Sequence, residues 1–233
     1  MKKKINLNLF AFCLLCLLAC KKDEVTTDAV LEDGKSIVIK DLAGDTETSL
    51  GNNIPGKEQR PFFTFLFRVK DQKQIWIKSK ADSAQYLKST DWDIAFTGNY
   101  NSIVFVNNGT AIGSPGFGGD GISKVVKVDQ AYNNITEAPA DNDFQNSDVN
   151  EIGWAESSTS AGWYTYDLNT HIMKRIVNRT YILKLNSGKY AKLEIVSIYK
   201  GNPPAVTDLY WPSPYLTFRY FVQEDGSKNL KTK

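Results

Sequence analysis

The chain has 233 residues, with 28 lysines and arginines against 26 aspartates and glutamates, and it contains a single histidine. Three of the basic residues lie at the N-terminus, so the rest is nearly neutral, without the basic run or stripe that indicates nucleic-acid binding. All three cysteines, Cys13, Cys16 and Cys20, lie in the first twenty residues. The remaining chain therefore offers no disulfide, no cysteine–zinc site and no thiolate nucleophile.

The N-terminus is typical of an export signal. Lysines at 2–4 precede an apolar run at 5–19, which is too short for a spanning helix of roughly 20 residues. The run ends in Leu-Leu-Ala-Cys, which resembles a bacterial lipobox and implies cleavage before Cys20 and lipidation of its thiol. We therefore expect a signal peptide at 1–19. Because two or more acyl chains hold a protein firmly in a bilayer, we also expect the lipidated Cys20 to be a membrane anchor.

The residues after Cys20 are Lys-Lys-Asp-Glu, similar to the short signal that sends some lipoproteins to the outer face of the outer membrane. We therefore expect a cell-surface protein anchored by lipid. The rest of the chain is long enough for one domain with a sizeable core. We expect a polar tether at 20–34, one domain at 35–225 and a flexible tail at 226–233.

From residue 36 onward the pattern is that of β-strands, rich in Val, Ile, Tyr, Phe and Trp. The expected strands are 36–42, 61–70, 74–78, 91–98, 101–108, 124–128, 179–185, 189–199 and 214–223. Turn signals at 71–73 and 186–188 predict two hairpins. A short helix is expected at 79–89, and residues 130–160 are expected to be mostly loop. We predict an all-β, antiparallel, single-domain fold with long loops and few or no helices.

Several segments resemble the HmuY family of haem-binding bacterial lipoproteins. They are TDWDIAFTG (90–98) with the glycine-rich loop after it, GWYTYD (162–167), NRTYILKLNSGKYAKLEIVSIY (178–199) and YLTFRYF (215–221). The resemblance implies an all-β fold with a pocket at one end of the sheets. It also implies haem held between two axial ligands, either two histidines or two methionines. Members are surface or secreted haemophores that pass haem to an outer-membrane receptor, and they are not enzymes.

The resemblance places one axial ligand near THIM (170–173), which contains the only histidine, His171, and Met173. Both residue types are haem ligands. Side chains two apart on a strand point to the same side. His171 and Met173 would then point in parallel, and they could approach iron from opposite faces of one porphyrin only if the ring wedged between them. We expect one of the two to ligate while the other packs beside it, and both remain candidates.

The other family ligand should come from 120–150, where this chain has no histidine, methionine or cysteine. Tyr132 is a weak candidate, as a phenolate ligand. Five-coordinate haem, a ligand shared across a dimer and no haem at all are the other options. In the last case His171 would be an exposed strand residue and Met173 a core filler.

Aromatic side chains can line a ligand pocket. Trp163 lies in the GWYTYD motif, while Tyr210 and Trp211 lie in a loop at 201–214, where exposed rings can stack on a porphyrin or a sugar. Core packing is the alternative use of these rings. We expect no catalytic residues and no metal other than haem iron.

Two functions follow from the sequence. The first is a surface lipoprotein that binds haem or a related tetrapyrrole non-covalently for uptake, with an outer-membrane haem receptor as partner. The second is a surface adhesion or glycan-binding module of the same fold, without haem.

Overall fold

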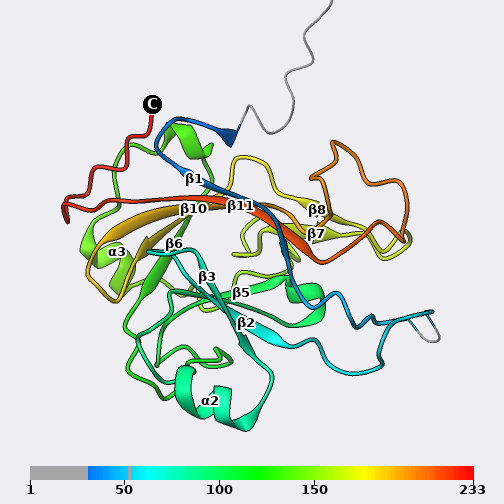
Figure 1. Ribbon diagram of the computed structural model, residues 1–233. Helices are drawn as coiled ribbons and strands as arrows, with labels where there is room; N and C mark the ends of the chain where they lie inside the picture. Colours follow the sequence, from blue (N-terminus) through cyan, green and yellow to red (C-terminus); the bar gives the residue numbers. More distant parts are fainter. Residues whose placement is uncertain (1–30, 52–53) are drawn as a thin grey trace, which may run out of the picture.

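The computed structural model describes residues 31–51 and 54–233. Cys20, the signal peptide at 1–19 and most of the expected tether lie outside these residues. Within the described ranges the chain folds into antiparallel sheets with two short α-helices, which confirms the predicted all-β fold (Figure 1). No helix in this part of the chain has the length and apolar character needed to cross a membrane.

The largest sheet has five strands in the order β1-β11-β10-β9-β6. Their bounds are Ile37–Ala43 for β1, Tyr215–Val222 for β11, Tyr190–Ser197 for β10, Thr180–Lys184 for β9 and Lys124–Val128 for β6. A second sheet has the order β3-β2-β4-β5, with bounds Lys73–Ile77, Thr64–Arg68, Ile94–Thr97 and Ile103–Val106. A small third sheet pairs β7 (Tyr164–Tyr166) with β8 (Met173–Arg175).

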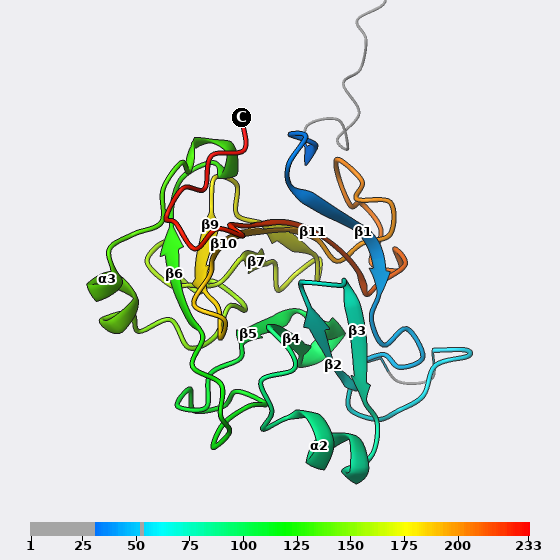
Figure 2. The same cartoon turned by 60° about the vertical axis from the view of Figure 1, so that its left-hand side comes forward.

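The two larger sheets pack face to face, because alternate side chains of each strand point toward the other sheet. Phe67 and Phe96 contact Phe218 across the interface, with ring centroids 5.2 and 5.3 Å apart. Figure 2 shows the five-stranded sheet above the four-stranded one. These rings belong to the main hydrophobic core of the molecule.

The outer face of each sheet is covered as well. Helix α2 (Lys80–Tyr86) and the residue after it cover an outer cluster on the four-stranded sheet, with the Trp92 side chain fully buried. Helix α3 (Asp141–Gln145) and the 3-10 turn η2 (Tyr132–Asn134) lie over the outer face of the five-stranded sheet. A second 3-10 turn, η1 (Asn99–Asn101), joins β4 to β5.

All nine strands expected from the sequence are present, and both predicted hairpins are confirmed. Gln72 and Gly188 take positive φ values of 57° and 79° in the two turns. The predicted short helix is α2, which begins with a capping box between Ser79 and Asp82. The strands β7 and β8 were not distinguished in the sequence, and His171 was wrongly placed on a strand.

The expected flexible tail at 226–233 is wrong, because these residues pack on the outer face of the five-stranded sheet. The Leu230 side chain is fully buried beside Ile182 and Phe144. Its backbone N–H donates to the Thr136 carbonyl at 2.8 Å. The tail is therefore part of the fold.

The tail also helps to hold a buried lysine. Lys192 is fully buried on the outer face of β10, and its Nζ donates to the Tyr132 and Ile135 carbonyls and to Thr232 Oγ1 at 3.0–3.1 Å. Burial, with a smaller contribution from nearby Arg219, lowers the pKa of Lys192 to about 8.

Leu230→Ala tests the docked tail. We expect the free energy of unfolding to fall by about 2–5 kcal/mol, because a buried leucine is truncated in a packed cluster. Urea unfolding followed by circular dichroism measures this. Lys231→Ala, an exposed neighbour, is the control and should change stability by less than about 0.5 kcal/mol. Equal, small effects of both variants would show that the tail does not dock.

Lys192→Met tests the buried charge. Because the folded-state pKa of Lys192 lies near 8 and its usual value is 10.5, the unfolded chain binds more protons between these pH values. Wild-type stability relative to the variant should therefore rise with pH across that window, by at most roughly 3 kcal/mol, and stay constant below it. Urea unfolding of both proteins from pH 6 to 10 gives this difference. A difference that does not vary with pH would contradict the assignment.

Candidate functional site

The β7–β8 hairpin carries the histidine and the methionine predicted as ligands. Its strands pair Tyr166 with Met173. Between them the chain makes a tight turn in which the His171 N–H donates to the Asp167 carbonyl at 2.8 Å. His171 has a positive φ of 57°, a conformation that turns favour and strands exclude. His171 and Met173 therefore do not lie in parallel on one strand.

The imidazole of His171 is exposed, and one of its nitrogens is already engaged. Its Nδ1 lies 2.8 Å from the hydroxyl oxygen of Tyr166. When Nδ1 carries the proton and donates it to Tyr166, Nε2 presents its lone pair for a ligand. A metal-binding histidine usually donates its other ring N–H to a carboxylate, a carbonyl or a water, and here the Tyr166 hydroxyl takes that place.

Met173 is half-buried and packs on the main core. Its backbone N–H donates to the Tyr199 hydroxyl at 2.9 Å. Burial raises the pKa of Tyr166, with a smaller contribution from the nearby Tyr100, and burial also raises the pKa of Tyr199 against the opposing hydrogen bond from Met173. Both phenols are therefore neutral at physiological pH and act here as hydrogen-bonding groups, not as phenolates.

Trp154 lies beside the Tyr166 ring. Its side chain is 43% exposed and meets the Tyr166 ring edge-on at 6.2 Å, and the Tyr166 ring lies 5.9 Å from that of His171. We call Trp154, Tyr166 and His171 the aromatic row. Two of its members come from the hairpin, and one comes from the long middle loop.

The position of Trp154 depends on Gly162. A Cβ at residue 162 would lie 2.4–2.5 Å from backbone atoms of residues 153–155, so only glycine allows the two segments to approach this closely. The buried guanidinium of Arg179 fixes the same loop. It donates to the Ser158, Ser160 and Gly162 carbonyls at 2.6–3.0 Å and pairs with Asp129.

The family model described as HmuY protein matches residues 31–220, most of the chain. The chain belongs to the HmuY family. No curated protein matches it.

Solved structures of HmuY-like proteins are similar over most of their length. One, from Bacteroides vulgatus, is described as HmuY-like and heme binding (15% identity, 80% of this chain and 90% of that one, TM-score 0.36). Another is apo PinO from Porphyromonas gingivitis (13% identity, 82% and 97%, TM-score 0.39). A third is the apo HmuY analog of Tannerella forsythia (12% identity, 81% and 95%, TM-score 0.36).

Tyr132 is wrong as an axial ligand for this member of the HmuY family. Its side chain is 1% exposed, and its ring lies between Lys192 and Arg219, 4.3 and 4.1 Å from their cationic groups. Burial raises the pKa of Tyr132, and its hydroxyl is bonded to Ser36 at 2.8 Å. Lys192 points to the outer face of the five-stranded sheet, while Met173 packs with the core on the inner face, so Tyr132 and Met173 lie on opposite sides.

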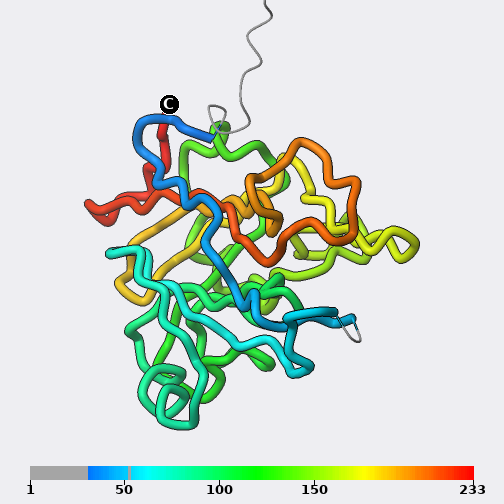
Figure 3. Tube along the Cα trace, turned by 45° about the vertical axis from the view of Figure 1, so that its right-hand side comes forward, coloured from blue at the N-terminus to red at the C-terminus, as the bar shows by residue number. Residues whose placement is uncertain are grey.

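The three predicted pocket aromatics differ in accessibility. Trp163 is buried in the core, with its Nε1 donating to the Ser102 carbonyl at 2.8 Å, so it is not available to a ligand. Trp211 is half-buried against the core, and its Nε1 donates to the Lys200 carbonyl at 2.9 Å. Tyr210 is 76% exposed, on a loop that lies beside the β7–β8 hairpin (Figures 1 and 3).

The pocket that the family resemblance implies does not lie beside the ligand candidates in either of two cavities, of about 500 and 260 Å³, because neither His171 nor Met173 lines them. Within residues 31–51 and 54–233, no group of three or more His, Cys, Asp or Glu side chains can hold a metal ion. The candidate site is therefore the exposed surface of the β7–β8 hairpin, which carries the His171 imidazole.

Tyr166→Phe tests the support of His171. The population of the Nδ1–H tautomer should fall, because the phenol no longer holds that nitrogen. Nitrogen-15 NMR resolves this cleanly, since the chain has a single histidine. Tyr210→Phe is the control, because no hydrogen bond from the described residues reaches its exposed hydroxyl, and it should leave the tautomer ratio unchanged. An unchanged ratio in Tyr166→Phe would show that the contact does not set the tautomer.

Proposed function

We propose that the protein is a surface-anchored lipoprotein that binds haem or a related tetrapyrrole non-covalently for uptake. Membership of the HmuY family supports haem as the ligand class. The observation that carries the proposal is the exposed imidazole of His171, supported at Nδ1 by Tyr166 and continuous with the ring of Trp154. We place the binding surface on the aromatic row.

His171 is the better ligand of the two candidates. Its side chain is exposed, whereas Met173 is half-buried against the core. The hydrogen bond at Nδ1 leaves Nε2 as the free ligand atom. Met173 then serves as an apolar neighbour that packs under the hairpin.

The residues fit ligation from one side. A second histidine is absent from the chain, and Tyr132 lies on the other side of the sheet. A single histidine is an established axial arrangement for haem iron. When bound, the haem iron would accept the Nε2 lone pair, and the chain itself would supply binding and orientation, not a reaction.

Affinity would come mainly from contact with the macrocycle. Aromatic rings stack favourably on flat conjugated systems, and apolar area contributes roughly 25 cal/mol per Å² before the costs of association. Trp154 and the exposed Tyr210 are the rings available for this contact. Since the aromatic row is open on one side, we expect weaker binding than in an enclosed pocket.

The anchoring part of the proposal rests on the sequence. The apolar run at 5–19 followed by Cys20 supports a lipid anchor, and the Lys-Lys-Asp-Glu segment supports surface display. A surface haem-binding protein needs a partner that takes the haem across the membrane. An outer-membrane receptor is that proposed partner.

A glycan-binding module is the second candidate function. The 76% exposure of Tyr210 and the 43% exposure of Trp154 favour it, since exposed aromatic faces also stack on sugar rings. In that case the row would bind oligosaccharides and give no haem spectrum. A glycan array would then identify the ligand.

Titration of the purified protein with haemin tests the proposal. We expect a saturable, red-shifted Soret band in the wild type. His171→Ala should abolish that band, because it removes the proposed ligand atom. Met173→Ala should retain the band with a modest loss of affinity, and Trp154→Ala should weaken binding about tenfold or less, the effect of roughly 1 kcal/mol of stacking.

Phe117→Ala, which removes an exposed ring outside the aromatic row, serves as the surface control and should bind like the wild type. A featureless titration of the wild type would remove haem binding. A Soret band lost in Met173→Ala but kept in His171→Ala would assign the ligand to the methionine.

A further inference from the structure

The aromatic row lies among exposed apolar side chains on neighbouring segments. Leu168 is exposed in the β7–β8 turn, three residues before His171. Leu209 and Tyr210 are exposed on the loop beside the hairpin (Figures 1 and 3). We call Leu168, Leu209 and Tyr210 the apolar rim. Single exposed apolar residues are ordinary, but a group of them on adjoining segments indicates a surface that another molecule covers.

The hairpin carries little charge. From residue 161 to residue 173 the sequence contains one charged residue, Asp167. Its Oδ1 accepts from the Asn169 and Thr170 N–H groups at 2.8 and 3.1 Å. These hydrogen bonds, with a smaller contribution from Lys174, hold the pKa of the carboxyl below its usual range. Two copies of this surface can therefore approach each other with little repulsion between like charges.

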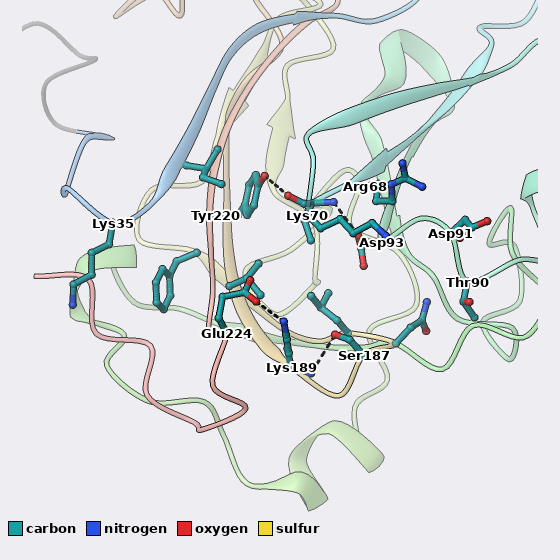
Figure 4. A pocket seen from close by; sticks show the side chains of 16 residues that line it. Lys35, Arg68, Lys70, Thr90, Asp91, Asp93, Ser187, Lys189, Tyr220 and Glu224 are labelled. Atoms are coloured by element: carbon teal, nitrogen blue, oxygen red, sulfur yellow. Dashed lines mark hydrogen bonds and ion pairs between the residues drawn. The ribbon is translucent and has the colours of Figure 1, made fainter.

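Neither of the two cavities encloses the aromatic row. The larger one opens between the two large sheets, at the end of the molecule away from the hairpin, and Lys70, Asp93 and Lys189 stand around it (Figure 4). The smaller one is lined by residues between 128 and 139. A flat ligand on the aromatic row would therefore have one face covered by this chain and the other face exposed.

The chain offers one exposed imidazole, whereas haem iron can take two axial ligands. His171 is the only histidine, and the contact of its Nδ1 with Tyr166 leaves Nε2 as the free ligand atom. Met173 packs on the core beneath the hairpin, and Tyr132 is enclosed on the other side of the five-stranded sheet. A second copy of the chain would bring an identical imidazole on an identical apolar surface.

Two-fold symmetry satisfies both requirements at once. A two-fold axis that lies in the plane of a macrocycle exchanges its two faces, and the same surface of each copy then meets the ligand. Each aromatic row covers one face of the macrocycle. The apolar rims of the two copies meet around its edge, where they remove apolar area from water.

We propose that one haem is bound between two copies of this chain, which face each other through their β7–β8 hairpins and each supply His171 Nε2 to the iron. This inference rests on the proposed haem-binding function and adds to it the partner, which is a second copy of the chain, and the stoichiometry.

Haemin titration of the purified protein, at a protein concentration well above the dissociation constant, tests the shared site. We expect the Soret change to end at one haemin per two chains, and sedimentation to show two chains in the haem-bound particle. Electron paramagnetic resonance should show low-spin ferric iron, because two imidazoles bind it. An end point at one haemin per chain would overturn the shared site and leave haem binding intact. The absence of any Soret change would overturn both.

Leu168→Glu and Phe117→Glu are matched variants that locate the contact between the copies. Each places a carboxylate at an exposed apolar position, so neither should affect folding, but Phe117 lies in the glycine-rich loop between β5 and β6. In Leu168→Glu the added charges of the two copies repel each other. We expect the two-chain complex to weaken at least about tenfold and the iron to become high-spin, while Phe117→Glu behaves like the wild type. Equal behaviour of the two variants would overturn the proposal, because the copies would not meet at the hairpin.

Discussion

The five-stranded sheet is buried on both faces, and most of the structure follows from that constraint. On β10, Leu193 and Ile195 face the core, while Lys192 and Glu194 face outward under a cover of loops. Buried charges need partners, because an unpaired one costs far more than a packed apolar group. Glu194 pairs with Arg219. Lys192 donates hydrogen bonds to the Tyr132 carbonyl in η2 and to the Thr232 hydroxyl in the tail. The loops and the tail that cover the outer face are therefore held on the sheet by polar groups as well as by apolar contacts.

The two ends of the sandwich then differ in character. At one end the β7–β8 hairpin and the middle loop present rings with little charge. At the other the sheets separate around Asp93 and Asn186, with polar groups over an apolar base. The first surface is where we propose that haem binds, and the second is a separate cavity lined by charged side chains. The fold supplies both without any change to its core, since each is built from loops and strand ends.

The scaffold could be predicted from the sequence because its strands carry strong local signals. Alternating apolar residues marked nine strands, and the Asn-Ser-Gly turn marked the β9–β10 hairpin. The strands β7 and β8 have only three residues each, which is too short to show the alternation of apolar and polar residues that marks a strand. The tail has one apolar residue, Leu230, and its partner Thr136 lies far away in the sequence. Long-range contacts of this kind leave no local pattern.

The site was less predictable for a related reason. Residue type and the positions implied by the family resemblance selected His171, Met173 and Tyr132, but their accessibility is decided by neighbours from other segments. Lys192 and Arg219 enclose Tyr132, whereas the turn of the hairpin exposes His171. The Tyr166–His171 contact could have been suspected from their closeness in the sequence. The role of Gly162 could be seen only once the two backbones were in place.

Arg179 has a consequence for how the aromatic row would respond to a ligand. Its guanidinium joins three carbonyls of the loop that carries Trp154, although the arginine itself precedes a strand of the main sheet. A ring held in this way has little freedom to lose when a partner arrives. Such preorganisation lowers the entropic cost of association. Natural variation at Arg179 would therefore be expected to alter recognition at the hairpin without touching any residue that contacts the ligand.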